Sequence, residues 1–192
     1  MKNIGLLGGS FDPPHNGHLY ISLEAKKILK LDEIWWLVTP QNPLKISRPA
    51  TYSERIKNCK VITKNYPIKI KEVEKSINSK YSYQTINYIK KYYKNINFFW
   101  LMGADNLLNF HKWQKWRLIF KDIPIVIFKR HGYNEKALKS IALKTFENYK
   151  ITTTILDKKY FSKLPAWTWI KNKEIKISST EIRNQREILR YE

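Results

Sequence analysis

Short apolar runs separated by helical patterns extend along the whole chain, and this order constrains the fold more than any other feature of the sequence. Several runs lack polar alternation, which is typical of strands that are buried on both faces of a parallel sheet. The expected strands are residues 4–7, 34–39, 68–73, 98–102 and 125–128. Strands that alternate with helices predict an α/β fold with a doubly wound parallel sheet. Because Ile and Lys alternate in residues 68–71, this strand is expected at an edge of the sheet.

The starts of the helices can be located from capping patterns. Leu19, Leu23 and Ile28 give an apolar stripe to a first helix at about residues 17–29. The other expected N-caps, each with its helix, are Thr51 with residues 52–64, Ser82 with 83–93, Asn134 with 135–149 and Ser178 with a last helix at about 178–190. At 192 residues, the chain is expected to form a single domain.

The composition excludes several classes of protein. A hydrophobic fraction of 43% and an aromatic fraction of 14% are too high for an intrinsically disordered chain. Cys59 is the only cysteine, which excludes a disulfide scaffold. The apolar runs are far shorter than the ~20 residues of a membrane-spanning helix, and the apolar start ends at residues 8–14 before a signal-peptide core can form. We therefore expect a cytoplasmic protein without a membrane partner.

The net charge of +20 comes from 36 Lys and Arg residues against 16 Asp and Glu residues. Lysine accounts for 29 of these cations, whereas proteins that bind phosphates through bidentate contacts favour arginine. A lysine excess spread along the whole chain is typical of compositional bias. The charge is compatible with a nucleic acid, a membrane surface or a small anionic substrate, and it does not select among them.

The segment after the first expected strand carries the clearest chemical pattern. In doubly wound sheets, ligands bind beyond the carboxyl ends of the strands, and Gly8 and Gly9 would let the backbone approach a ligand there. His15 and His18 follow at a spacing of three as the first helix begins, so that both can face one side. A helix N-terminus attracts anions, and the segment is therefore interpreted as a phosphate site.

Other interpretations of this segment are weaker. The Walker and dinucleotide-binding glycine patterns are absent from the sequence, and so is the G-x-S-x-G turn of a nucleophilic serine. Two histidines are too few to hold a metal without a third ligand at metalloprotease spacing. The remaining alternative is structural, with His15 and His18 only capping and packing the turn.

Two motifs, one near each end of the chain, resemble those of a known family. The first is Gly-Gly-Ser-Phe-Asp-Pro-Pro-His-Asn-Gly-His at residues 8–18, and the second is Ile-Ser-Ser-Thr-Glu-Ile-Arg at residues 177–183. The first resembles the signature of bacterial nicotinate-nucleotide adenylyltransferases, and the second resembles a signature of the wider nucleotidyltransferase superfamily to which they belong. The resemblance implies a Rossmann-like nucleotidyltransferase fold over residues 1–192, with the helix at about 178–190 completing the ATP site. It also implies a reaction of NAD biosynthesis, in which ATP and nicotinate mononucleotide give deamido-NAD and pyrophosphate.

The resemblance also implies roles for individual residues. His15 and His18 would be catalytic, donating hydrogen bonds to phosphate oxygens as charge develops. The residues implied at the ATP site are Gly8, Gly9, Ser10, Phe11, His15, His18, Gly103, Asp105, Ser179, Thr180, Ile182 and Arg183. Those implied at the mononucleotide site are Ser10, Lys45, Thr85, Trp113 and Arg130. Mg²⁺ would arrive with ATP rather than occupy a site of the protein's own.

Several alternatives stay open at this point. Asp105 is equally suited to cap the next helix, and Trp113 is also suited to the core. The nearest rival functions are a pantetheine-phosphate adenylyltransferase or a cytidylyltransferase. A basic nucleic-acid-binding protein and a fragment of a class I aminoacyl-tRNA synthetase are more distant rivals. The sequence decides neither the preference for nicotinate over nicotinamide mononucleotide nor whether the protein is a homo-oligomer.

Overall fold

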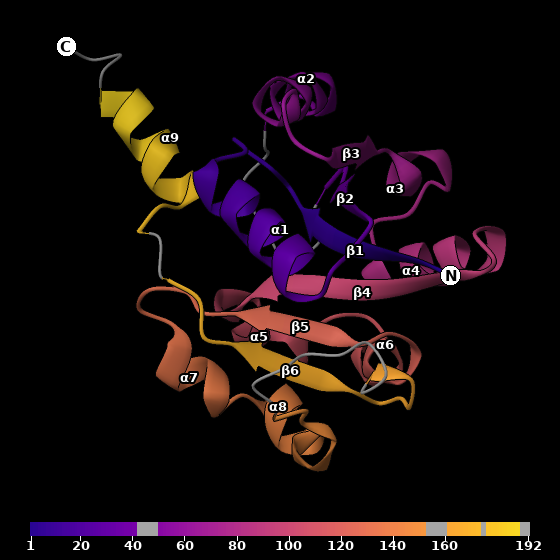
Figure 1. Ribbon diagram of the computed structural model, residues 1–192. Helices are drawn as coiled ribbons and strands as arrows, with labels where there is room; N and C mark the ends of the chain where they lie inside the picture. The colour runs from indigo at the N-terminus through magenta and orange to yellow at the C-terminus, as the bar shows by residue number, and fades with distance from the viewer. Residues whose placement is uncertain (42–49, 153–160, 174–175, 189–192) are drawn as a thin grey trace.

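An all-parallel sheet of six strands runs through the protein in the computed structural model (Figure 1), which describes residues 1–41, 50–152, 161–173 and 176–188. The strands are β1 (Lys2–Gly9), β2 (Glu33–Val38), β3 (Ile68–Lys71), β4 (Ile96–Gly103), β5 (Ile125–Phe128) and β6 (Trp167–Ile170). Their order is β3-β2-β1-β4-β5-β6, and every neighbouring pair is parallel. The predicted doubly wound sheet is therefore confirmed, with β3 at an edge and the strand order reversing between β1 and β4.

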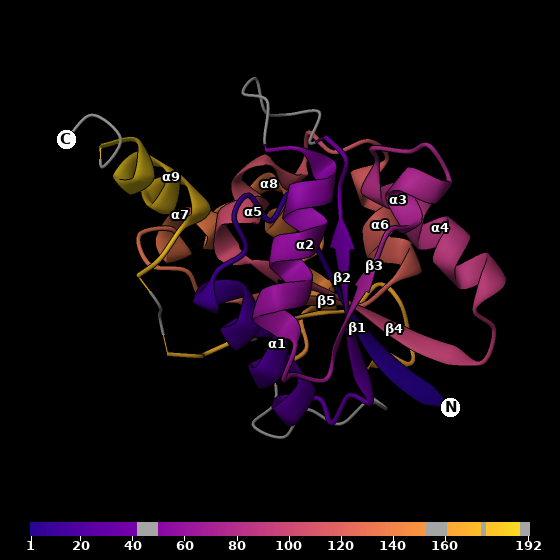
Figure 2. The ribbon, with the colours of Figure 1, turned by 90° about the horizontal axis from the view of Figure 1, so that it is seen from above.

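Helices cover both faces of the sheet. They are α1 (Asn16–Ile28), α2 (Tyr52–Thr63), α3 (Val73–Ser76), α4 (Ser82–Tyr92), α5 (Ala104–Phe110), α6 (Trp116–Asp122), α7 (Asn134–Leu138), α8 (Ile141–Thr145), the 3₁₀ helix η1 (Glu147–Tyr149) and α9 (Ser179–Ile188). Figure 2 shows α1 and α2 on one side of the first strands, with α4 and α6 on the other. In Figure 1, α9 lies beside the start of α1, although the two are at opposite ends of the sequence.

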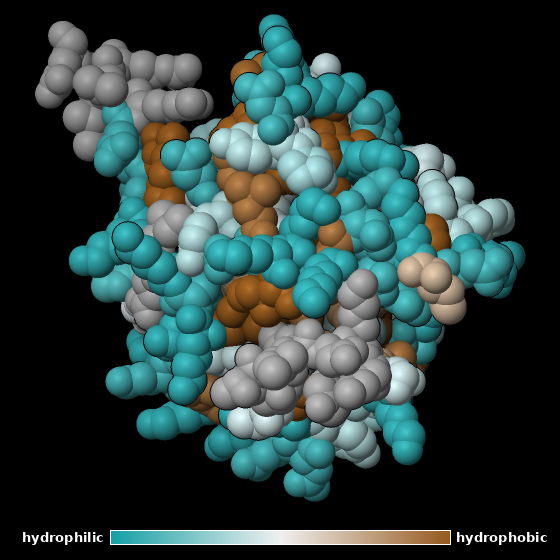
Figure 3. All heavy atoms as spheres, viewed as in Figure 1, coloured by the Kyte–Doolittle hydropathy of each residue, from teal (hydrophilic) through white to brown (hydrophobic). Residues whose placement is uncertain are grey.

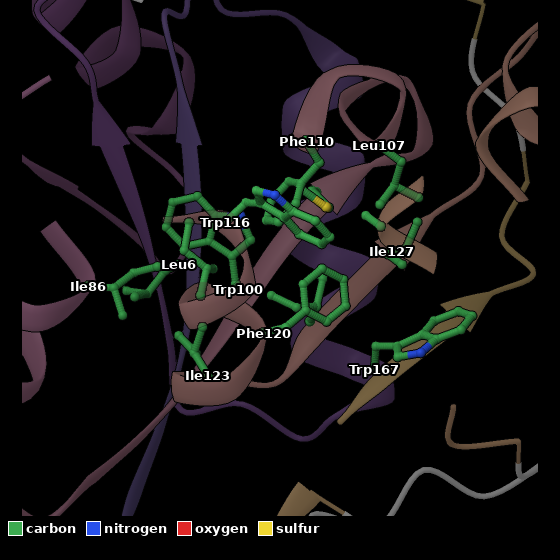
Figure 4. Close-up of a cluster of buried hydrophobic side chains, with 14 of the residues drawn as sticks. Leu6, Ile86, Trp100, Leu107, Phe110, Trp116, Phe120, Ile123, Ile127 and Trp167 are labelled. Carbon is green, nitrogen blue, oxygen red and sulfur yellow. The ribbon is translucent and has the colours of Figure 1, made fainter. Parts of the chain in front are cut away.

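The core is divided into two clusters because the strands are buried on both faces. In β4, Phe98, Trp100 and Met102 face one cluster, whereas Phe99 and Leu101 face the other. Successive side chains of a strand point to opposite faces, so a strand covered on both sides must be apolar throughout. The cluster that contains Trp100 is rich in aromatic rings (Figure 4). This double coverage explains why the apolar runs of the sequence form strands.

Two of the predicted capping patterns are present. The Thr51 Oγ1 accepts a hydrogen bond from the Glu54 N–H at 3.3 Å, and the Glu54 carboxylate accepts one from the Thr51 N–H at 3.0 Å, which completes the capping box of α2. At α9, the Ser178 Oγ accepts a hydrogen bond from the Glu181 N–H at 3.2 Å. In contrast, α4 begins at Ser82 without a side-chain cap, and the prediction that Ser82 caps it is wrong.

The helix predicted at residues 135–149 is wrong as a single element, because the chain forms α7, α8 and η1 there. The break falls at Ser140, whose Oγ accepts a hydrogen bond from the Leu143 N–H at 3.4 Å and so caps α8. Asn134 does not cap α7, because its Oδ1 accepts a hydrogen bond from the Arg130 N–H at 2.9 Å. In both cases a polar side chain accepts a hydrogen bond from a nearby backbone N–H group. A continuous helix over residues 135–149 would not contain these two hydrogen bonds.

On the face drawn in Figure 3, hydrophilic residues predominate, and hydrophobic residues show in several separate areas between them. This fits a chain whose lysines are spread along its whole length. Within the ranges that the structure describes, no helix is both long enough and apolar enough to cross a membrane.

Candidate active site

The carboxyl ends of β1 and β4 open into a cavity of about 700 Å³. Its walls come from the loop between β1 and α1, the first turn of α1, the start of α5 and the segments around Arg130 and Ser178. Doubly wound sheets bind ligands at this point of the strand order. The residues implied at the ATP site that line the cavity are Gly8, Gly9, Ser10, Phe11, His15, His18, Gly103, Asp105, Ser179 and Thr180.

His15 and His18 form the N-terminal cap of α1. The Nδ1 of His15 accepts a hydrogen bond from the Gly17 N–H at 3.1 Å, and the Nδ1 of His18 accepts one from the His15 N–H at 3.2 Å. A neutral imidazole that accepts at Nδ1 carries its proton at Nε2. The two histidines therefore do cap the helix, and the same hydrogen bonds favour the tautomer in which both rings can donate from Nε2. The centroids of the two rings are 3.9 Å apart.

The environment of His15 keeps its ring neutral. The side chain is buried, and burial lowers the pKa of His15 from 6.5 to about 4; the charge of Arg130 acts in the same direction and that of Glu181 opposes it. At neutral pH the ring is therefore in the form that can accept the hydrogen bond from Gly17. A charged ring would carry a proton on both nitrogens and would lose this bond.

We expect the lowered pKa of His15 to make folding stability depend on pH. The unfolded chain takes up the proton near pH 6.5 and the folded chain only near pH 4, so stability is present above pH 6.5 and is lost as the pH falls toward 4. From pH 7 to pH 5 the loss attributable to His15 is about 2 kcal/mol. Urea unfolding at both pH values measures it, with His15→Asn, a capping residue that does not titrate, as the control. An equal loss in both proteins would contradict the prediction.

Gly17 and Phe11 hold the two histidines in place. A Cβ atom at Gly17 would lie 2.9 Å from Cε1 and Nδ1 of His15, so only glycine leaves room for this ring. Phe11 adopts a left-handed backbone conformation with a φ of 48°. Its buried ring stacks on Trp36 at a centroid distance of 4.6 Å and contacts His18 at 4.8 Å. The Phe11 side chain thus belongs to the core, and its backbone is the part that is available to the cavity.

The C-terminal motif contacts the loop between β1 and α1 directly. The Ser179 Oγ donates a hydrogen bond to the Pro13 carbonyl at 2.9 Å. The Arg183 guanidinium donates to the Asp12 carbonyl and lies 3.6 Å from the Asp12 carboxylate. The structure therefore brings the two predicted motifs together. Ile182 and Arg183 do not line the cavity, unlike the other residues implied at the ATP site.

Asp105 and Arg130 meet at the end of β4. Asp105 does not cap α5, which begins after Gly103 without a side-chain cap, so the capping alternative is excluded. The Asp105 Oδ1 lies 4.0 Å from the Arg130 Nε. The Asp105 side chain also lies over Gly103, where a Cβ atom would be only 2.5 Å from this oxygen. This buried oxygen has no hydrogen-bond partner among the residues that the structure describes. Asp105 therefore offers an unused acceptor beside the cavity.

A second cavity, of about 110 Å³, adjoins the first. The residues common to both linings are Gly8, Gly9, Trp100, Asn106 and Trp113. Trp113 is half-buried and packs on Phe110 with a centroid distance of 4.7 Å, so it is both a core residue and a lining residue. Of the other residues implied at the mononucleotide site, Ser10 and Arg130 line the first cavity and Thr85 is buried in α4 and lines neither. Lys45 lies outside the described residues.

Two buried charged residues, one lining the second cavity and one behind the loop after β1, carry no signal in the sequence. Glu74, in α3, lines the second cavity, and burial raises its pKa against the opposing effect of the Thr39 and Thr85 hydroxyls. Arg55, in α2, is buried behind the loop that follows β1. Both residues lie in polar segments that are typical of solvent-exposed helices. No local signal marks them, because they are buried by residues far away along the chain.

Comparisons with known proteins agree with this geometry. The cytidylyltransferase-like family matches residues 6–185 of the chain. A protein of Ruegeria sp. (strain TM1040), named a probable nicotinate-nucleotide adenylyltransferase, is 41% identical over 182 residues, covering 95% of this chain and 96% of that protein. A protein of Brucella suis biovar 1 (strain 1330) with the same name is 40% identical, covering 94% and 93%. The solved structure of Plasmodium falciparum nicotinic acid mononucleotide adenylyltransferase complexed with NaAD has the same fold, with a TM-score of 0.69 at 22% identity over 96% of this chain and 83% of that one.

The fold, the site and the family match together define a nucleotidyltransferase of the cytidylyltransferase-like class. The two bacterial relatives are similar to this chain over nearly its whole length, and they identify the family within this class. The chain belongs to the nicotinate-nucleotide adenylyltransferase family. The resemblance that rests on residues 8–18 and 177–183 is therefore confirmed, and so is the Rossmann-like nucleotidyltransferase fold.

Proposed function

We propose that this protein transfers the adenylyl group of ATP to nicotinate mononucleotide, giving deamido-NAD and pyrophosphate in NAD biosynthesis. The observation that carries the proposal is the histidine cap of α1. It places His15 and His18 at the cavity in the tautomer that donates from Nε2, next to a helix N-terminus whose dipole favours anions. Such a site suits a phosphate group on which negative charge increases during the reaction.

In this reaction, a 5′-phosphate oxygen of the mononucleotide attacks the α-phosphorus of ATP. The bond from that phosphorus to the bridging oxygen breaks, and pyrophosphate leaves with the electron pair. No covalent bond to the protein is needed, so catalysis depends on positioning and on charge stabilisation. We assign charge stabilisation to His15 and His18, and the binding of the reacting phosphates to Ser10 and the backbone of Gly8 and Gly9.

The leaving pyrophosphate is assigned to the C-terminal motif at the start of α9, where Ser179 and Thr180 line the cavity. Arg183 is assigned to the same phosphates, which requires it to release the Asp12 carbonyl that it binds in this structure. The acceptor oxygen of Asp105 suits a ribose hydroxyl of ATP. In this way the helix at residues 178–190 would complete the ATP site.

The carboxylates at the cavity fit a Mg²⁺ ion that is held mainly by the nucleotide. Asp12 lies 3.6 Å from the Arg183 guanidinium, and Asp105 lies 4.0 Å from the Arg130 Nε, so each carboxylate already has a cation beside it. Mg²⁺ keeps much of its coordination to water and substrate phosphates in such sites. When bound, the ion supplies positive charge that neutralises the phosphate oxygens.

The second cavity is assigned to the pyridine ring of the mononucleotide, with Trp113 as the stacking surface. Lys80 and Lys112 line this cavity, and the pKa of its acidic residue, Glu74, is raised by burial, which favours the uncharged form. A pocket with this balance of charge favours the carboxylate of nicotinate over the neutral amide of nicotinamide. We assign the 5′-phosphate to Ser10 and Arg130, with Lys45 as a further cation.

Product analysis tests the proposed function directly. The protein is incubated with ATP and Mg²⁺ and, separately, with nicotinate mononucleotide, nicotinamide mononucleotide or pantetheine phosphate, and the products are identified by mass. We expect deamido-NAD to form fastest. If only dephospho-coenzyme A forms, the protein is instead a pantetheine-phosphate adenylyltransferase. If no adenylylated product forms with any acceptor, the proposal is wrong.

Replacing Trp113 with alanine is expected to raise the KM for the mononucleotide about tenfold, because aromatic stacking contributes about 0.5–1.5 kcal/mol. The KM for ATP should change much less, since the ring also borders the second cavity while most ATP contacts lie in the first. Steady-state kinetics with each substrate varied in turn measures both values. Tyr92→Ala, at an exposed aromatic residue of α4, is the control. An equal rise in both KM values would remove the stacking assignment.

A further inference from the structure

Arg55 is a buried arginine whose guanidinium donates hydrogen bonds to four backbone carbonyls. Its Nε donates to Ala50 at 3.0 Å, one terminal nitrogen donates to Ser10 at 2.6 Å and Thr39 at 2.8 Å, and the other donates to Pro40 at 2.7 Å. Only 1% of the residue is exposed. In the ranges that the structure describes, no carboxylate oxygen lies within 4.0 Å of this guanidinium.

This arrangement is costly for a residue that serves only stability. Burial lowers the pKa of Arg55, and the charge of the Asp12 carboxylate, which is not in contact with the guanidinium, offsets only part of this effect. Removing a charge from water without a contacting ionic partner is unfavourable, and an apolar side chain of similar volume is often at least as stabilising in such a place. Three of the four acceptors, the carbonyls of Ser10, Thr39 and Pro40, follow directly after the ends of β1 and β2. The hydrogen bonds of Arg55 are therefore concentrated where the cavities open, and not in the centre of the core.

We propose that Arg55 is a positioning residue for adenylyl transfer, which fixes the loop after β1 against the end of β2 so that the two reacting phosphates meet in line. This inference rests on the proposed function. Ser10 lines the first cavity and Thr39 lines the second, so one guanidinium joins the walls of both substrate sites. The peptide bond after Ser10 is trans, and its C=O and N–H therefore point in opposite directions. The bond from Arg55 to this carbonyl turns the Phe11 N–H away from α2.

The same loop is held from its other side by α9. Arg183 donates to the Asp12 carbonyl, two residues beyond the carbonyl that Arg55 binds. The side chain of Arg183 is 34% exposed, so it can exchange this carbonyl for a phosphate, whereas Arg55 is enclosed. Asp12 also accepts a hydrogen bond from the Ala50 N–H at 3.3 Å, which adds a second contact on the side of α2. Arg55 therefore provides the fixed side of the loop and Arg183 the side that can respond to substrate.

Two variants of Arg55 separate positioning from charge. Arg55→Lys keeps the positive charge but cannot reach four carbonyls, and Arg55→Met removes both functions. Lys57→Met changes an exposed residue of the same helix and is the matched control. We expect both Arg55 variants to lower kcat per folded molecule about tenfold, with smaller changes in the two KM values. We also expect faster amide hydrogen exchange in residues 8–12 of the substrate-free variants, which a role confined to distant packing would not produce.

The measurements are made well below the Tm of each variant, with the folded fraction determined by circular dichroism. A kcat for Arg55→Lys within about threefold of the wild type would overturn the proposal. Failure of both variants to fold would also overturn the proposal, because Arg55 would then be required for folding and not for positioning the loop. The wild-type protein tests the proposed function separately. If it makes no deamido-NAD, that function fails, while hydrogen exchange of the loop still decides whether Arg55 positions it.

Discussion

Replacing His18 with alanine lowers kcat at least ~100-fold, while the KM values for ATP and the mononucleotide change much less. The variant removes one imidazole donor from the cavity and also the acceptor of the His15 N–H. Its effect falls on kcat because such donors act mainly on charge that develops in the transition state. The Phe11 ring loses its contact with His18 but keeps its stacking on Trp36, so we expect the loop to stay folded.

Steady-state kinetics and circular dichroism of purified His18→Ala check this prediction. His111→Ala is the control, because His111 is a histidine of the same chain that lines neither cavity. Near-normal turnover in a folded His18→Ala protein would show that His18 serves only as a helix cap.

Adding a single methyl group at Gly17 lowers kcat about 100-fold, because a displacement of about 1 Å at a catalytic group can cost this much in rate. The new Cβ atom of Gly17→Ala would lie 2.9 Å from the His15 ring, which must move. The ring then loses the 3.1 Å hydrogen bond that fixes its tautomer. Alanine has the higher helix propensity, by about 1 kcal/mol, which offsets part of the strain in the folded state. Activity should therefore fall much more than stability.

Asn16→Ala provides the control for this variant, because Asn16 is the exposed neighbour in the same turn of α1. Both variants are compared in kcat and in Tm. A Gly17→Ala protein with wild-type kcat would mean that the position of the His15 ring does not matter for the reaction. A large fall in Tm with unchanged kcat per folded molecule would lead to the same conclusion.

The sheet could largely be predicted because its strands are covered on both faces. A run such as residues 98–102 contains no polar residue, and only a buried strand or a buried helix accommodates it. The last strand, β6, is only four residues long and includes Thr168, so its pairing with β5 is what makes it a strand. The helix predicted at residues 135–149 is interrupted for a similar reason, since the capping role of Ser140 depends on how the chain packs there.

The residues of the candidate site that are close together in the sequence could be proposed from the sequence alone. His15 and His18 are three residues apart, and their spacing already indicates a shared face at a helix start. Arg55 could not be found in this way, because it is separated by 45 residues from Ser10, whose carbonyl it binds. Arg183 is an intermediate case. Its motif marks it as a site residue, but only the structure reveals its contact with Asp12.

The contact between α9 and the loop after β1 has a consequence for the synthesis of the protein. Asp12 and Arg183 are 171 residues apart. At ~5–20 residues per second, roughly 10–30 s pass between the addition of the first and the second. During this interval the loop and its histidines exist without the residues that complete the cavity around them. A chain that is still attached to the ribosome should therefore neither bind ATP tightly nor consume it before α9 has emerged.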